Sequence, residues 1–343
     1  MKANKEITIY DIAEKLKYAP STISRALNDH PSISKNTTLL IKKVAKEMGY
    51  RPNSLAASLR NNRSKTIGIM ISRINRPFVS SLISGVEETA RKSGYNVIIS
   101  QSNDKYENEV INAQTLYNSR ISGLIVSLSM ETRKLDHLRP FINQGIPIVF
   151  VDRVPDMADA HKVIIDNYTA GYRAAEHLIE QGCTRIAHFA GAQHRNVYSE
   201  RKKGYMDALK DHNLKADKDF IITFESLSFE EGEKATKKLL DLPIPPDGIF
   251  AANDTTAVSA IMYAKKRGIK IPDELAVIGF NDDPIASIVE PALSTVIHPA
   301  IKMGQLSAKR ILQHAVEKDE EVLFETSILP TELCIRNSSL KNK

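Results

Sequence analysis

The sequence predicts two kinds of structure in one chain of 343 residues: a small all-α head, and an α/β body of two doubly wound parallel-sheet lobes. The first 65 residues contain only short helical patterns. From Thr66 onward, apolar β-branched runs alternate with amphipathic helical stretches, a pattern typical of parallel sheets covered on both faces. At least eight such runs follow, more than one compact core accommodates, so two lobes are expected.

Three helices are expected in the head. The first begins after Thr8, whose hydroxyl can cap it, with Asp11 near the positive end of the helix. The second begins at Pro20, which suits a first turn because its missing N–H costs nothing there. Ser34 is the expected cap of the third helix, and Gly49 is its expected stop.

A basic stretch, "RPNSLAASLRNNRSK", separates head from body. It has room for about two helical turns, which are not stable alone. We therefore expect a helix-turn-helix head at 1–51, a hinge helix and linker at 52–64, and a body at 65–343. Within the body, one lobe is expected from residues 65–165 plus 294–320, and the other from 166–293 plus 321–343.

Polar side chains gather where the predicted strands of the body end. They are Asp152 and Arg153, Asp166 and Asn167, Asn253 and Asp254, and Asn281 and Asp282. Because doubly wound sheets bind ligands at the carboxyl ends of their strands, these positions predict a binding cleft.

The charge is unevenly divided. Residues 1–65 hold 13 Lys+Arg and 5 Asp+Glu, a net of +8, whereas the remaining residues hold 34 and 36, a net of −2. A basic head on a nearly neutral body fits a polyanion partner, although a solvated basic surface has the same signature. The chain lacks a membrane-length apolar run and any stretch resembling a signal peptide, so a cytoplasmic protein is expected.

The sequence favours binding over catalysis. Nucleotide-binding, nucleophile-elbow and zinc-protease motifs are absent, and the nine histidines are scattered without metal-ligand spacing. We therefore expect that the protein is not an enzyme and that it binds neither a cofactor nor a metal ion. Cys183 and Cys334 form no disulfide framework and are expected to act as small hydrophobic residues.

The second head helix carries polar residues where a core helix would not. Ser21, Thr22, Ser24 and Arg25 lie among apolar residues that would face the head's core. Two helices joined by a tight turn, the second with such a face, indicate a helix-turn-helix that enters the major groove of double-stranded DNA. An arginine there can form two hydrogen bonds to guanine. The alternative is a polar face in a small bundle.

These segments, with others along the chain, resemble the LacI/GalR family of transcriptional regulators. The resemblance covers nearly the whole chain and keeps the order and spacing of the family motifs, which here read "TIYDIAEKLKYAPSTISRALND", "NSLAASLR", "KTIGIMIS", "IPIVFVDR", "ERKKGYMDAL", "PDGIFAANDTTAVSAI" and "IPDELAVIGFND". It implies a periplasmic-binding-protein-like body that holds a small effector, often a sugar, between its lobes. It also implies a homodimer that binds a palindromic operator.

The resemblance also implies roles for single residues of the head. Pro20, Ser21 and Arg25 match base-reading positions, Thr8, Tyr10, Ser34 and Thr37 match phosphate contacts, and Leu59 matches the leucine that wedges into the minor groove. The full set of expected DNA contacts is Thr8, Tyr10, Pro20, Ser21, Thr22, Ser24, Arg25, Asn28, Ser34, Thr37, Tyr50, Asn53, Ala56 and Leu59. The sequence departs from the family at Lys17-Tyr18-Ala19, where Ala19 cannot supply the usual cap and phosphate hydroxyl.

In the body, the resemblance implies effector contacts by Phe78, Asp152, Arg195, Arg201, Asn253, Asn281 and Asp282. Arg201 matches the arginine that grips the effector, and Arg195 in the same loop could serve an acidic ligand. Asn281 stands where many members carry a hydroxyl-binding aspartate, a departure that leaves the sugar class open. The chain ends in "TELCIRNSSLKNK", without the leucine heptads of tetrameric members, which favours a dimer.

The leading hypothesis is a ligand-responsive repressor of a carbohydrate-utilisation operon. A sugar-binding receptor with a vestigial head is the alternative of another class, and a salt-titrated DNA-binding assay separates the two. Within the family, control by a phosphorylated carrier protein is a further alternative. The sequence does not identify the effector, show whether it is an inducer or a corepressor, or identify the operator.

Overall fold

The computed structural model describes residues 7–50, 64–157, 159–316 and 324–341, and of residues 315 and 316 only the backbone. The chain divides into two compact units, 1–64 and 65–343, which are described separately here. The expected hinge at 52–64, with Asn53, Ala56 and Leu59, lies outside the described residues, apart from Ser64.

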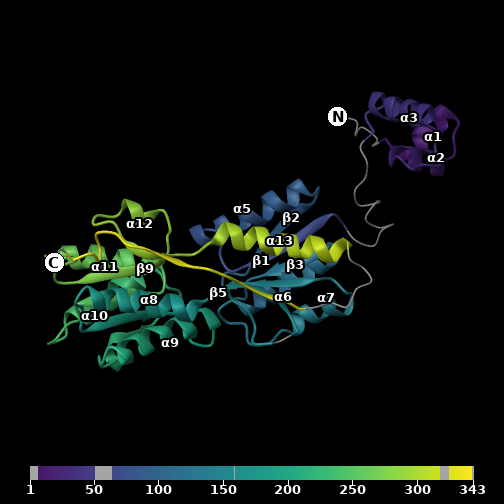
Figure 1. Cartoon of the computed structure of the whole chain (residues 1–343). Coiled ribbons are helices and arrows are strands. Elements are labelled where there is room, and N and C mark those ends of the chain that lie inside the picture. The colour runs from purple at the N-terminus through teal and green to yellow at the C-terminus, as the bar shows by residue number, and fades with distance from the viewer. Residues whose placement is uncertain (1–6, 51–63, 158, 317–323, 342–343) are drawn as a thin grey trace. The chain divides into compact units, whose positions relative to one another are not determined.

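The head is built from α1 (Ile9–Leu16), α2 (Pro20–Leu27) and α3 (Lys35–Glu47) (Figure 1). The caps expected from the sequence are present. The Thr8 hydroxyl accepts from the Asp11 backbone N–H and the Asp11 carboxylate accepts from the Thr8 N–H at 2.7 Å, a capping box. Ser34 caps α3 by accepting from the Thr37 N–H at 3.2 Å. Ile12, Ile23 and Ile41, one from each helix, are fully buried at the centre.

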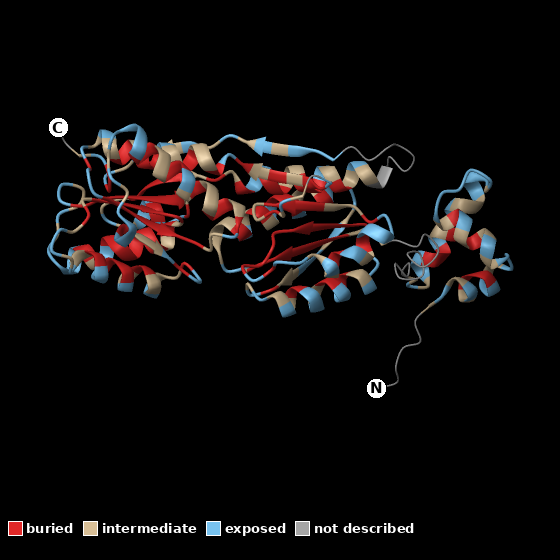
Figure 2. Ribbon diagram, turned by 90° about the horizontal axis from the view of Figure 1, so that it is seen from below, coloured by how far each residue is buried: buried red, intermediate tan, exposed pale blue. Residues whose placement is uncertain are grey.

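The body contains two six-stranded sheets, each with helices on both faces (Figures 1 and 2). The first has the order β11-β5-β4-β3-β1-β2 and is parallel throughout. Its strands are β1 (Thr66–Ile71), β2 (Asn96–Gln101), β3 (Gly123–Val126), β4 (Ile148–Val151), β5 (His161–Ile165) and β11 (Thr326–Leu329).

The second sheet has the order β12-β10-β9-β8-β6-β7, and only the β10–β12 pair is antiparallel. Its strands are β6 (Ile186–Ala190), β7 (Ile221–Thr223), β8 (Gly248–Ala251), β9 (Ala276–Asn281), β10 (Ser294–Ile297) and β12 (Glu332–Cys334). The sheet interior is buried, as the red strands between the helices in Figure 2 show.

Helices connect the strands in each lobe. The first lobe has α5 (Pro77–Lys92), α6 (Tyr106–Asn118), η1 (Asp136–Leu138), α7 (Arg139–Asn143) and α13 (Ala300–Val316). The second has α8 (Asn167–Glu180), α9 (Asn196–Asp211), η2 (Lys218–Phe220), α10 (Phe229–Leu240), α11 (Asp254–Lys266) and α12 (Ile285–Ile288).

The lobe boundaries expected at 294 and 321 are wrong by one strand each. β10 pairs with β9 and therefore belongs to the second lobe, whereas β11 pairs with β5 and belongs to the first. The chain thus passes between the lobes after β5, after β10 and after β11. Strand pairing decides to which lobe β10 and β11 belong. Their sequences do not, because both segments have the same apolar pattern and either sheet could bury them.

Helix α13 fixes the first lobe by packing directly on α5, beside which it lies in Figure 1. A Cβ added at Gly304 would meet the Leu82 carbonyl oxygen at 2.1 Å, and one added at Gly85 would meet the Ile301 carbonyl oxygen at 2.2 Å. The two helices therefore cross at a distance that only glycine permits. Helix α13 follows the crossover after β10. Through this contact it packs on α5, the helix that begins at the cleft.

Candidate functional site

Helix α2 presents a polar face opposite its buried face. Ile23 and Ala26 are fully buried, whereas Ser21, Arg25 and Asn28 are exposed at helical spacing. The Asn28 side-chain amide donates to the Ser24 carbonyl at 2.7 Å and so closes the helix end. Pro20, Thr22 and Ser24 are half-buried. The polar face thus consists of short hydroxyl-bearing residues around one long arginine.

Hydroxyl groups lie at the N-termini of the two other head helices. Thr8 caps α1 and Ser34 caps α3, and the Ser34 and Thr37 hydroxyls hydrogen-bond at 2.8 Å. Tyr10 is 68% exposed on the first turn of α1. Helix N-termini attract anions, so these positions suit phosphate groups. Tyr50 instead packs against the head's core, and burial raises its pKa.

A polar cavity of about 80 Å³ lies between the lobes of the body. Its lining includes five of the residues expected from the sequence, namely Phe78, Asp152, Arg201, Asn253 and Asn281. It also includes Arg153, which the sequence placed at a strand end of the cleft, and residues that the sequence analysis missed, namely Arg73, Arg76, Asp104, Tyr198, Asp283 and His298. Both lobes contribute, because these residues come from strand ends and helix starts on either side of the cleft.

Arg201 is held rigidly in this cavity. Its Nε donates to Asn167 Oδ1 at 2.8 Å, its Nη1 donates to the Ala252 carbonyl at 3.0 Å, and its guanidinium lies 3.4 Å from the centre of the Phe280 ring. Burial lowers its pKa to about 10, so it remains charged at neutral pH. Arg201 therefore offers a preoriented cation to a ligand.

Carboxylates and arginines alternate along the first-lobe wall. Asp104 pairs with Arg153 at 2.5 Å and with Arg73 at 3.5 Å. Burial opposes the ionisation of Asp104, but Arg153, the Met130 N–H and Arg73 together outweigh it, so the pKa of this carboxyl is lowered. Asp152 has a φ of 61°, a strained left-handed conformation for a residue with a side chain, and burial raises its pKa. Strain of this kind gathers at ligand sites.

The loop after β9 corrects one expectation. The Asp282 carboxylate does not line the cavity but accepts from Arg336 Nη2 at 2.8 Å. Asn281 and Asp282 both have positive φ, 118° and 59°, so the loop turns sharply and presents Asp283 to the cavity instead. Burial raises the pKa of Asp283 to about 6. The adjacent acidic pair 282–283 was the only sequence signal, and it did not say which carboxyl faces the ligand.

Asn253 lines the cavity but is largely committed to structure. Its Oδ1 accepts from the Thr256 N–H at 3.0 Å, which caps α11, and its Nδ2 donates to the Leu227 carbonyl at 3.0 Å. Phe78, in contrast, presents a ring to the cavity and stacks on His298 with centroids 4.1 Å apart. His298 is buried, and burial holds the pKa of its imidazole well below the ordinary value, so it is neutral.

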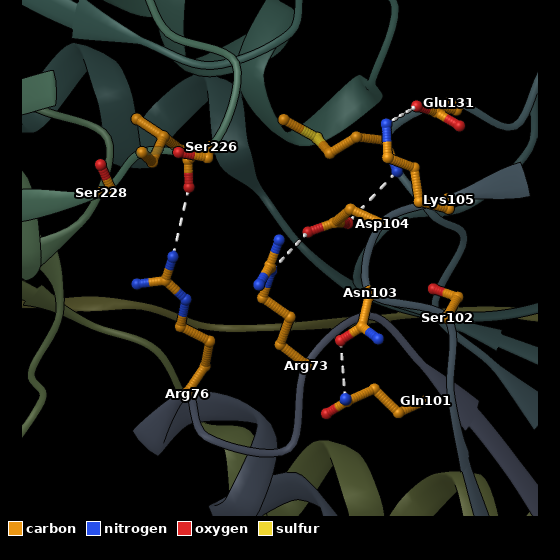
Figure 3. A network of polar contacts seen from close by, with 12 residues as sticks. Arg73, Arg76, Gln101, Ser102, Asn103, Asp104, Lys105, Glu131, Ser226 and Ser228 are labelled. Carbon is orange, nitrogen blue, oxygen red and sulfur yellow. Dashed lines mark hydrogen bonds and ion pairs between the residues drawn. The ribbon is translucent and has the colours of Figure 1, made fainter. Parts of the chain in front are cut away.

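Hydrogen bonds cross the cleft on both sides of the cavity. Arg76 Nη2 donates to the Ser226 carbonyl at 3.2 Å, a bridge that Figure 3 shows beside the Arg73–Asp104 pair. Arg153 Nη2 donates to the Tyr198 hydroxyl at 3.2 Å. These bonds join the two lobes across the cleft.

Arg195, also expected to contact the effector, does not line this cavity. It precedes Arg201 by six residues at the start of α9, about 240° around a helix, and therefore faces another side. It lines a separate, larger cavity between the lobes.

The described residues contain no helix that could cross a membrane and no group of His, Cys, Asp and Glu that could hold a metal ion. Cys183 is buried, as expected, and Cys334 is half-buried.

A helix-turn-helix head and a two-lobed body with a polar cavity between its lobes define a class of protein in which a DNA-reading module is joined to a ligand-binding module. The chain matches the bacterial regulatory proteins of the lacI family over residues 8–53. It matches the periplasmic binding proteins and sugar binding domain of the LacI family over residues 64–336. The chain belongs to the LacI family.

Known relatives are similar along their whole length. The NTD biosynthesis operon regulator NtdR of Bacillus subtilis is 32% identical over 332 residues, which are 97% of this chain and 99% of that protein. The repressor CytR of Escherichia coli is 31% identical over 350 residues, with 99% of each chain covered.

Solved structures are similar in fold. The Lac repressor dimer bound to operator and the anti-inducer ONPF has a TM-score of 0.86 at 24% identity, with 98% of this chain and 100% of that chain covered. A LacI transcriptional regulator of Alkaliphilus metalliredigens in complex with D-xylulofuranose has a TM-score of 0.71 at 28% identity, with 81% of this chain and 100% of that chain covered.

Proposed function

We propose that the chain is a transcriptional repressor that binds a palindromic operator as a homodimer. Its affinity for the operator falls or rises when a sugar or sugar derivative binds between its lobes. One observation carries the proposal: a helix-turn-helix with an exposed arginine and a polar interlobe cavity occur in one chain of the LacI family. The name of one relative, a ribose operon repressor, fits control of a carbohydrate operon.

On the DNA side, α2 is the reading helix. Its exposed Ser21 and Arg25 can enter the major groove because Ile23 and Ala26 anchor the opposite face in the head's core. Pro20 and Ser21 are short, so Arg25 is the dominant base reader. The hydroxyls of Thr8 and Ser34, at two helix N-termini, position the head on phosphates.

On the effector side, the cavity combines the groups that hold a sugar. Arg201 supplies a cationic fork, Asp152 and Asp283 supply carboxyl oxygens, and the stacked Phe78 and His298 rings supply an apolar face. Asp283 compensates for Asn281, which lacks the carboxylate that many family members carry at that position. Solved relatives in complex with D-xylulofuranose and with cellobiose support a sugar.

The cavity is small for an effector. Ligand pockets have volumes of about 300–1,000 Å³, whereas this cavity has about 80 Å³. We therefore expect the lobes to move apart when the effector enters, and the effector shifts the protein only by its different affinity for the two arrangements.

An exposed apolar edge supports the homodimer. β2 is an edge strand of the first sheet, and its Ile98 and Ile99 are 38% and 41% exposed. Uncovered edge strands with apolar side chains are a liability that a second copy removes.

The test is selection of DNA from a random-sequence pool by the full-length protein. We expect a palindromic consensus, whose binding then changes with one member of a panel of pentoses, hexoses, nucleosides and disaccharides. The Arg25→Ala variant is the control for specific enrichment. A pool that stays random would contradict the operator proposal, and a consensus that no member of the panel affects would contradict the sugar-effector proposal.

A further inference from the structure

The loop after β9 has a strained shape on which the interlobe cavity depends. Asn281 and Asp282 have φ values of 118° and 59°. Residues with side chains rarely adopt such angles, which persist only where surrounding contacts impose them. The turn directs Asn281 and Asp283 to the cavity and Asp282 away from it. The contacts that impose this turn therefore help to build the site.

The second sheet holds the backbone of this loop. The Asp283 N–H donates to Asp254 Oδ2 at 2.7 Å, and the Asp282 N–H donates to Thr295 Oγ1 at 3.3 Å. These bonds also bring three carboxyl groups together. Burial raises the pKa values of Asp254 and Asp283, and the neighbouring carboxylates raise them further. A cation beside the loop offsets this repulsion.

Arg336 supplies that cation. Its Nη2 donates to Asp282 Oδ1 and its Nη1 donates to the Leu293 carbonyl, both at 2.8 Å. The planar guanidinium reaches both acceptors at once, which the single ammonium of a lysine does not. The side chains of Arg336 and Asp282 are only 21% and 28% exposed. The pair is therefore shielded from water, unlike exposed ion pairs, which contribute little.

Arg336 is itself fixed by the C-terminal segment, which follows β12. Its N–H donates to Ser294 Oγ at 2.7 Å, and its carbonyl accepts from the same hydroxyl at 2.9 Å. Ser338 Oγ accepts from the Ser294 N–H at 2.8 Å and donates to the Val277 carbonyl at 2.6 Å. Ser294 and Ser338 are fully buried. The segment thus presents the guanidinium to the loop from a fixed position.

The Asp283 carboxyl lies where the two lobes meet. The Asn281 side chain, the charge of Arg76 and the Phe78 N–H all act on it, and they oppose the rise in its pKa that burial causes. Asn281 belongs to the second lobe, whereas Arg76 and Phe78 lie at the start of α5 in the first. The direction of this one carboxyl therefore affects both walls of the cavity.

We propose that Arg336 is a positioning residue of the interlobe site: by pairing with Asp282, it turns that carboxylate away from the cavity and directs the Asp283 carboxyl into it. The inference rests on the proposed function, because it concerns the cavity in which the effector is proposed to bind. Arg336 is not among the described residues that line this cavity. It acts on effector recognition only through the loop.

The test is carboxyl footprinting of the full-length protein, in which a carbodiimide couples glycine ethyl ester to accessible carboxylates and mass spectrometry locates the products. Asp283 is 7% exposed and should react slowly in the wild type. In Arg336→Met we expect it to react at least about fivefold faster, because the released loop opens locally. Asp247, which accepts from the Thr184 and Arg185 N–H groups in the same lobe, should react equally in both proteins.

Arg267→Met is the matched control, because Arg267 Nη1 donates to Asp241 Oδ1 at 2.9 Å in an ion pair of the same kind in the same lobe. This variant should speed the labelling of Asp241 and leave Asp283 as in the wild type. Unchanged labelling of Asp283 in Arg336→Met would overturn the proposal. So would a parallel rise at Asp247, which would show that the whole lobe has loosened.

A second variant approaches the pair from the other side. Asp282→Ala removes the acceptor and should also speed the labelling of Asp283. Adding Arg336→Met to it should have little further effect, because both changes break one interaction. Independent effects of the two substitutions would contradict a role of Arg336 through Asp282.

Calorimetry with D-ribose, D-xylulose and cellobiose gives a readout that a merely structural role would not move. For each of these sugars that the wild type binds, Arg336→Met and Asp283→Ala should weaken binding by similar factors, at least about tenfold. The double variant should bind no more weakly than Asp283→Ala. Normal sugar binding by Arg336→Met would overturn the proposal. Footprinting uses neither sugar nor DNA, so its failure is distinguishable from failure of the proposed function.

Discussion

Arg25 is exposed on the polar face of α2, and short side chains surround it. Arg25→Ala should cost about 1–3 kcal/mol of binding free energy on the selected operator and leave binding to random DNA nearly unchanged, because a base reader carries sequence information. Fluorescence anisotropy at fixed salt measures both affinities. Ser34→Ala is the comparison, since a phosphate contact should weaken both. Equal losses for Arg25→Ala would make it a phosphate contact.

Arg201 connects Asn167 and the Ala252 carbonyl as well as facing the cavity. Arg201→Ala should weaken effector binding at least about tenfold, since charge-assisted hydrogen bonds contribute about 1.5–3 kcal/mol. Operator binding without effector should remain, and the response to effector should be lost. Calorimetry and anisotropy measure these quantities, with Lys210→Ala on the exposed side of α9 as the control. Collapse of effector-free operator binding would show that Arg201 is structural.

Asp254 couples stability to pH. It is fully buried, accepts from the Thr295 hydroxyl and the Asp283 N–H at 2.7 Å each, and burial raises its pKa to about 7. A carboxyl with a raised pKa binds its proton more tightly in the folded state. Its contribution to stability is therefore complete below the unfolded pKa, about 3.9, and is lost as pH rises through about 7.

The free energy of unfolding from urea titrations should thus fall for the wild type between pH 5 and pH 8, relative to Asp254→Asn, by at least about 1 kcal/mol, because one pKa unit corresponds to about 1.4 kcal/mol. Asp273→Asn, at an exposed position, should follow the wild type. Parallel pH profiles of Asp254→Asn and the wild type would contradict this assignment.

Between elements, the crossing of α5 and α13 depends on glycine. Gly304→Ala brings a Cβ against the Leu82 carbonyl oxygen at 2.1 Å, so the helices must separate. We expect a loss of about 1–3 kcal/mol in the free energy of unfolding. Ser84→Ala, on the exposed side of α5, is the control and should be nearly neutral. Unfolding by urea measures both, and an unchanged stability of Gly304→Ala would show that the helices have room to adjust.

Sequence reasoning succeeded for elements whose ends are set by local chemistry. Thr8, Pro20 and Ser34 mark helix starts because capping and a fixed φ act within a few residues, and all three were confirmed. The assignment of β10 and β11 to lobes was wrong, because strand partners are chosen across long sequence separations.

At the scale of the whole molecule, the exposed edge of the first sheet is the feature that a second copy would cover. Ile99→Asp on β2 should shift the protein from dimer to monomer and weaken operator binding at least about tenfold, because both heads must then bind separately. Ile328→Asp, on β11 at the opposite edge of the same sheet, is the matched control. Light scattering coupled to size-exclusion chromatography measures the mass. A dimeric Ile99→Asp protein would place the interface elsewhere.

The sequence by itself determined the division into a basic helical head and an α/β body, the helix caps, and three strand-end residues of the interlobe cavity, Asp152, Asn253 and Asn281, while Phe78 and Arg201 came from the resemblance to the family. Periodicity, capping and charge are local properties, so they can be recognised from neighbouring residues in the sequence. Only the tertiary structure decided that Asp283 rather than Asp282 faces the cavity, that His298 stacks on Phe78, and that Arg195 lines a separate cavity. The direction of a side chain depends on the turn of its loop and on the lobe packed against it, and both are set by contacts between residues far apart in the chain.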